Sequence, residues 1–99
     1  MHNALINVNV RIGKGCIINT GALIEHESSI GDFCHISTHS VVNGQVNIGN
    51  NSFIGSNAVI ANNINLPDGV IIAAGGCMLK SPAKTGTYIG NPARLFSKS

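Results

Sequence analysis

His26 is the side chain of this sequence whose immediate neighbours best suit acid–base chemistry. It stands between Glu25 and Glu27, two of only four acidic residues in the chain. A carboxylate beside an imidazole orients the ring and raises its basicity, which helps the ring to accept a proton. The same three residues could also form a solvated turn. The spacing alone leaves both interpretations open.

Two further histidines and three cysteines are the other residues with reactive side chains. His35 follows His26 by nine residues and His39 by thirteen. His35 could contact a ligand or a carbonyl of a neighbouring chain. Copies of His39 could meet around a metal, but a packing or water-bridged role is favoured for them. The odd number of cysteines, Cys16, Cys34 and Cys77, is not typical of a secreted disulfide framework.

The composition excludes several classes of protein. Charged residues are 10% of the chain against 43% hydrophobic residues, which is not typical of a disordered segment. Six Lys and Arg with a net charge of +2 cannot form a dense surface for nucleic acid. The longest mostly apolar run, 70–79, is half the roughly 20 residues that span a bilayer. The first residues lack an export signal, so we expect a cytoplasmic protein.

A strict repeat of six residues organises the chain from Ile6 onward. Thirteen successive positions are aliphatic or Met with no insertion: Ile6, Ile12, Ile18, Ile24, Ile30, Ile36, Val42, Ile48, Ile54, Ile60, Leu66, Ile72 and Met78. A helix is excluded because, at about 100° per residue, such a series would wind around the whole helix. His2 precedes the repeat, and we assign it no role.

Each repeat is interpreted as a short strand followed by a tight turn. Three residues after each aliphatic residue, eight of twelve positions are Gly or Asn, which tolerate a positive φ. Three repeats would form one triangular coil of 18 residues, and coils of parallel strands stack about 4.8 Å apart. We therefore predict an all-β parallel β-helix of a little over four coils over residues 1–83, with a C-terminal extension over 84–99.

The residues just before each aliphatic position distinguish three outer faces. The first face carries Leu5, Leu23, Val41, Val59 and Cys77; the second carries Ile17, His35, Phe53 and Ile71; the third carries Arg11, Ser29, Asn47 and Asn65. Two adjacent faces are therefore apolar on the outside, which is typical of an interface. Head-to-tail packing of one on the other predicts a homotrimer, with Gly21, His39, Asn57 and Gly75 nearest its axis.

These repeats resemble the left-handed parallel β-helix of the hexapeptide acyltransferases. The resemblance covers nearly the whole chain and is closest at Ile24-Glu25-His26-Glu27, at 30–37 and at Ile89-Gly90-Asn91-Pro92-Ala93. This order resembles the sugar acetyltransferases of the NeuD/PglD type, which transfer acetyl from acetyl-CoA to an amine or hydroxyl of a sugar or sugar nucleotide. The left hand is implied by this resemblance and not by the periodicity.

The resemblance also implies roles for individual residues. His26 would be the general base, Glu27 its partner, and His35 a contact to the thioester or pantetheine of acetyl-CoA. Gly44 and Ala74 would let the pantetheine arm approach the backbone, and Lys84 and Arg94 would bind the CoA phosphates. No metal is expected. These relatives usually carry an N-terminal subdomain for the sugar nucleotide, whereas the repeats here begin at Ile6, so the acceptor stays open.

Two other functions remain as alternatives. A catalytically inert trimeric scaffold, or a fragment of an acyltransferase, would have the same repeats. A metalloenzyme similar to the γ-class carbonic anhydrases is disfavoured, because that class needs two metal-binding histidines five residues apart and here the close pairs are four and nine apart.

The position of His26 predicts where an active site would be built. His26 falls at the corner between the first face and the third face, and His35 falls in the middle of the second face. The interior aliphatic residues lie between them, so one chain cannot bring both to one ligand. Packing of the first face on a neighbour's second face would place His26 of one subunit and His35 of the next in one groove.

Overall fold

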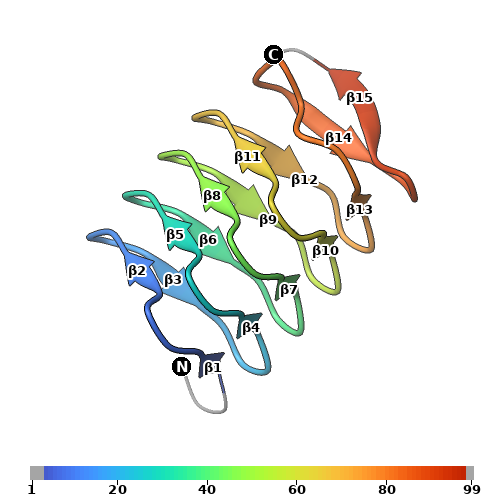
Figure 1. The fold of residues 1–99 in the computed structure, drawn as a ribbon. Coiled ribbons are helices and arrows are strands. Elements are labelled where there is room, and N and C mark those ends of the chain that lie inside the picture. The colour runs from blue at the N-terminus through green and yellow to red at the C-terminus, as the bar shows by residue number, and fades with distance from the viewer. Residues whose placement is uncertain (1–3, 98–99) are drawn as a thin grey trace.

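The computed structural model describes residues 4–97 and shows a triangular coil that repeats every 18 residues (Figure 1). His2 lies outside the described residues. The coil measures 31 × 22 × 20 Å. None of the described residues belongs to a helix, so this part of the chain has no helix that could cross a membrane. The all-β prediction is confirmed.

Three sheets of parallel two-residue strands form the three faces. The first sheet contains β1 (Leu5–Ile6), β4 (Leu23–Ile24), β7 (Val41–Val42), β10 (Val59–Ile60) and β13 (Cys77–Met78). The second contains β3 (Ile17–Ile18), β6 (His35–Ile36), β9 (Phe53–Ile54), β12 (Ile71–Ile72), β14 (Thr87–Ile89) and β15 (Arg94–Ser97). The third contains β2 (Arg11–Ile12), β5 (Ser29–Ile30), β8 (Asn47–Ile48) and β11 (Asn65–Leu66). The predicted left-handed β-helix of hexapeptide repeats and its three faces are confirmed.

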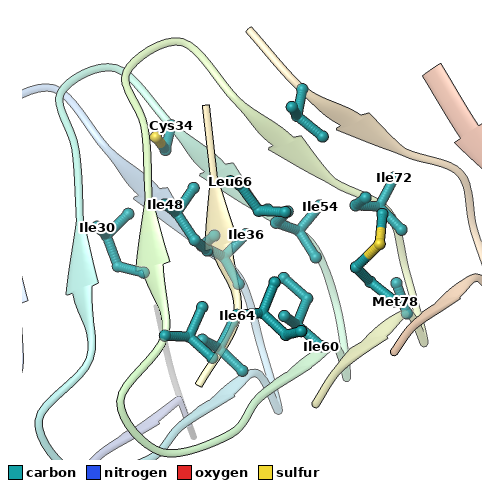
Figure 2. Close-up of a cluster of buried hydrophobic side chains, with 14 of the residues drawn as sticks. Ile30, Cys34, Ile36, Ile48, Ile54, Ile60, Ile64, Leu66, Ile72 and Met78 are labelled. Carbon is teal, nitrogen blue, oxygen red and sulfur yellow. The ribbon is translucent and has the colours of Figure 1, made fainter. Parts of the chain in front are cut away.

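The aliphatic residue of each strand points into the coil and forms one continuous core (Figure 2). Ile24, Ile36, Ile54 and Ile60 have no exposed surface. Small residues such as Ala22 fill the second inward position of each repeat, so that the three corners can approach one another. At the first coil Ile6 is 41% exposed, because only one neighbouring coil covers it. Truncating a central isoleucine to alanine would cost about 2–5 kcal/mol.

The turns between the strands share one backbone conformation. All twelve turn positions at the predicted spacing have a positive φ, including the four that are neither Gly nor Asn: Glu27, Phe33, His39 and Gln45. At one corner a vertical ladder also ties the coils together. Asp32 Oδ1 accepts from the amide of Lys14 at 3.0 Å, and Asn50 Oδ1 accepts from the amide of Asp32 at 2.8 Å.

The C-terminal segment continues the coil further than thirteen repeats predict. β14 pairs in parallel with β12 and sets Tyr88 opposite Ile72, and β15 then turns back antiparallel to β14. Tyr88 is buried, and its hydroxyl donates to the carbonyl of Lys84 at 2.6 Å. The first and second faces therefore each have five parallel strands, whereas the third has four.

Candidate active site

His26 lies at the corner between the first and third faces, as predicted, in the turn that joins β4 to β5. His26 is exposed. Its backbone carbonyl accepts a hydrogen bond from the backbone amide of Gln45, one coil further on, at 3.1 Å. Within residues 4–96 neither ring nitrogen of His26 has a hydrogen-bond partner.

The two acids beside His26 are held by amide side chains of adjacent coils. Glu25 Oε1 accepts from Asn7 Nδ2 at 3.0 Å, and Glu27 Oε1 accepts from Gln45 Nε2 at 3.1 Å. Both bonds run along the corner of the coil. Each bond ties a carboxylate that is adjacent to His26 in the sequence to a neighbouring coil. The expected partnership of Glu27 with His26 stays a prediction.

The residues at the same turn position in successive coils form a column along this corner. Residues 18 apart are stacked by the strand register, which pairs Leu23 with Val41 and Val59 with Cys77. The column therefore runs Val8, His26, Gly44 and Asn62, and the chain leaves the repeat before Lys80. Gly44 is buried next to the imidazole of His26. Because glycine has no side chain, the ring lies directly against the backbone at this position.

A pocket of about 200 Å³ lies at the far end of this column. It is lined by Met78, Leu79, Lys80, Pro92, Ala93 and Arg94. Two cations thus meet over apolar walls, an arrangement that suits an anion attached to a planar or aliphatic group. The sequence predicted Lys84 and Arg94 for this role. Lys84 is exposed and outside the pocket lining, whereas Lys80, which sequence analysis did not assign, lies in it.

His35 lies in the middle of the second face, as predicted, on strand β6. Its Nε2 accepts a hydrogen bond from Asn19 Nδ2 at 2.9 Å, and its ring meets Phe53 edge to face with 5.0 Å between centroids. The neutral ring consequently carries its proton on Nδ1. Asn19 was missed because its partner is 16 residues away, a spacing that only the coil brings into contact.

Two other residues that the sequence analysis discussed, Ala74 and His39, lie at the corner between the first and second faces. Ala74 is exposed in the turn between β12 and β13, at the corner between the two apolar faces, and so is not beside Gly44. His39 is exposed at the same corner, with its ring against Gly21. No group of three or more metal-binding side chains occurs among the described residues.

The three cysteines are free thiols. Cys16 and Cys34 point inward one coil apart, and each donates to a glycine carbonyl, Gly31 at 3.0 Å and Gly49 at 3.1 Å. Burial raises the pKa of the Cys34 thiol above its usual value, and the thiol of Cys16 next to it adds to the shift. A reactive nucleophile needs a lowered pKa. Cys34 is therefore part of the core.

Known proteins share this repeat and this fold. Residues 27–62 match the family described as bacterial transferase hexapeptide (six repeats). No curated protein sequence matches the chain. The resemblance to the hexapeptide-repeat transferases is confirmed for the repeat and for the fold.

Solved structures of acetyltransferases superpose on nearly the whole chain. The acetyltransferase domain of PglB from Neisseria gonorrhoeae matches with a TM-score of 0.74 and 22% identity over 96% of this chain and 55% of that chain. PerB from Caulobacter crescentus, solved with CoA and GDP-perosamine, matches with 0.74 and 25% over 97% and 55%. Soybean serine acetyltransferase matches with 0.82 and 32% over 88% and 40%. The chain thus spans about half the length of these structures or less.

Proposed function

We propose that this chain is the catalytic β-helix of an acetyl-CoA-dependent acyltransferase that acetylates an amine or hydroxyl of a sugar or sugar nucleotide. Structures with the same fold include PerB bound to CoA and GDP-perosamine, and the PglB acetyltransferase domain in complex with acetyl-CoA. These comparisons support the acyl donor and the class of acceptor. The positions of residues in this chain indicate where the acyl donor and the base would lie.

The observation that carries the proposal is the distance between His26 and the basic pocket. Met78, which lines the pocket, lies three coils beyond Ile24 in the register of the first sheet, which corresponds to about 14 Å at a strand spacing of about 4.8 Å. The pantetheine arm has twelve bonds between its sulphur and the phosphate oxygen, as many as four main-chain residues, so it spans about 13–14 Å when extended. CoA phosphates held by Lys80 and Arg94 would therefore place the thioester beside His26.

His26 then has a defined task at the thioester. An exposed imidazole nitrogen accepts the proton of the acceptor amine or hydroxyl while that group attacks the thioester carbonyl. The tetrahedral intermediate expels the CoA thiolate, which takes the proton back from the imidazolium. In this proposal Glu27, which is adjacent to His26 in the sequence, is the partner that stabilises the imidazolium between these two steps.

The subunit arrangement is part of the same proposal. Ile17, Phe53 and Ile71 are 38–51% exposed on the second face, and the first face is apolar along its length. A homotrimer would cover both faces. The groove between two subunits would contain His26 of one and His35 of the next. We place this assembly in the cytoplasm, as the sequence predicts.

An acetyl-CoA thiol-release screen over amino sugars, sugar nucleotides and serine tests the proposal. We expect turnover with at least one sugar compound and none with serine. Turnover with serine alone would overturn the assignment of the acceptor. If the chain neither binds CoA nor releases thiol with any acceptor, the inert scaffold would be favoured.

The shared groove has its own test in mixed trimers of His26→Ala and His35→Ala chains, each expected to be nearly inactive. Random assembly should restore about a quarter of the sites, because each site needs a native His26 from one chain and a native His35 from the next. Activity that stays at the level of the two parents, with subunit exchange verified by mass spectrometry, would contradict the composite site.

A further inference from the structure

The bare α-carbon of Gly44 is the surface on which the imidazole of His26 lies. A Cβ added at Gly44 would lie 3.0 Å from Cε1, 3.1 Å from Nε2 and 3.5 Å from Nδ1 of that ring. The three heavy atoms nearest to that Cβ all belong to the ring. The ring therefore occupies the volume that a side chain at position 44 would need.

The backbone does not require a glycine at this position. The positive φ of this turn belongs to Gln45, at 58°, and Gly44 itself is not in the left-handed region. The equivalent positions of the other coils carry Val8, His26 and Asn62, so the corner accommodates large side chains elsewhere. By contrast, Gly21, which lies under His39, has a φ of 73°. That backbone conformation favours glycine at position 21 independently of the contact with His39. The imidazole is thus the contact that accounts for glycine at 44.

We propose that Gly44 is a positioning residue that holds the ring of His26 against the coil, and this inference rests on the proposed role of His26 as the base. A methyl group at 44 would sit closer to Cε1 and Nε2 than carbon and nitrogen atoms normally approach. His26 is exposed, so its ring would yield by turning outward while the coil stays in place. The nitrogen that accepts the proton would then leave its position beside the thioester.

This role differs from the backbone contact with pantetheine that the sequence suggested for Gly44. The residue is buried beneath the ring, so its effect on a ligand passes through His26. Contacts of 3.0 and 3.1 Å require the ring to move by a few tenths of an ångström, a fraction of the roughly 1 Å misplacement that costs on the order of a hundredfold in rate. The binding of acetyl-CoA depends on other residues of the groove and should change little.

The Gly44→Ala variant tests the proposal by kinetics. We expect kcat to fall by about three- to tenfold, with KM for acetyl-CoA within about twofold of the original chain. Thermal unfolding should occur at the same or a higher temperature, since alanine fits the backbone there and restricts the unfolded chain. Gly44→Ala in a His26→Ala background is the matched control, and there the added methyl should have no further effect on the residual rate. A loss of the same size in that background would show that Gly44 acts independently of His26.

Nuclear magnetic resonance separates this proposal from the proposed function. The Cε1–H resonance of His26, assigned by its loss in His26→Ala, should move in Gly44→Ala, while that of His39 should stay in place. This outcome would support the positioning role even if the chain transferred no acetyl group, in which case only the proposed function would fail. A His26 resonance that stays in place in a folded Gly44→Ala chain would overturn the positioning role.

Discussion

Asn19 donates its side-chain Nδ2 to Nε2 of His35 across 2.9 Å, and this bond leaves Nδ1 of His35 as the nitrogen that carries the proton. His35 lies on β6, and Asn19 follows directly after the neighbouring strand β3 of the second face. The register pairs Ile17 of β3 with His35. The ring is held on its other side by Phe53, edge to face. An imidazole fixed in this way presents one N–H donor in a constant direction.

Replacing Asn19 by alanine should release the ring of His35. If His35 contacts the thioester or pantetheine through its Nδ1–H, KM for acetyl-CoA should rise by about three- to tenfold, since a hydrogen bond contributes about 1 kcal/mol. The value of kcat should change much less. Nitrogen NMR should report the proton on Nδ1 in the original chain, and a proton on Nε2 would contradict the donor role of Asn19.

Phe53→Asp should dissociate the homotrimer that we propose. Phe53 is 38% exposed in the single chain and lies in the middle of the second face, so a carboxylate there would be buried unpaired in the interface. Asn47→Asp, on the polar third face, is the matched control and should leave the trimer intact. Light scattering checks both. An unchanged trimer in Phe53→Asp would mean that this face is not the interface.

Lys80→Ala and Arg94→Ala should weaken CoA binding through its phosphates. We expect the Kd for CoA to rise by about tenfold for each, because a charge-assisted hydrogen bond contributes about 1.5–3 kcal/mol. The affinity for S-acetyl-pantetheine, which has no phosphate, should not change. Lys84→Ala is the informative comparison, since Lys84 was predicted for the same role and lies outside the pocket lining. Equal losses for both ligands would place the phosphates elsewhere.

The raised pKa of Cys34 predicts a specific dependence of stability on pH. The folded chain keeps this thiol protonated to a higher pH than the unfolded chain, whose thiol titrates near 9.0. The contribution of Cys34 to folding is therefore complete below pH 9.0 and is lost as the pH rises further. Urea unfolding between pH 7 and 10.5 should show a decline that Cys34→Ala reduces. An identical decline in that variant would assign the slope to other groups.

The period of six was sufficient to predict the triangular coil and its three faces, whereas the left hand came from the family resemblance. An aliphatic residue at each strand and a turn with positive φ after it specify the three faces, so His26 and His35 could be placed before the structure was known. The register of 18 residues also placed Gly44 one coil above His26.

Contacts that depend on side-chain direction could not be predicted in the same way. The ring of His26 lies on Gly44 in the coil above, whereas the ring of His39 lies on Gly21 in the coil below. Lys80 lies in the pocket because the chain leaves the repeat after Met78 and returns at Pro92 and Ala93, which no period describes. The parallel pairing of Tyr88 with Ile72, 16 residues apart, breaks the 18-residue spacing for the same reason.

The central claim is that His26 transfers a proton from the acceptor and does not hold the cofactor, and one paired measurement tests it most directly. Isothermal titration with CoA and single-turnover acetyl transfer should be measured on the original chain and on His26→Ala, with the acceptor found by the screen. We expect the same Kd for both chains and a loss of transfer of about a hundred- to ten-thousandfold in the variant, the range of general base catalysis. An equal loss of CoA binding and transfer, or transfer that survives without His26, would contradict the account.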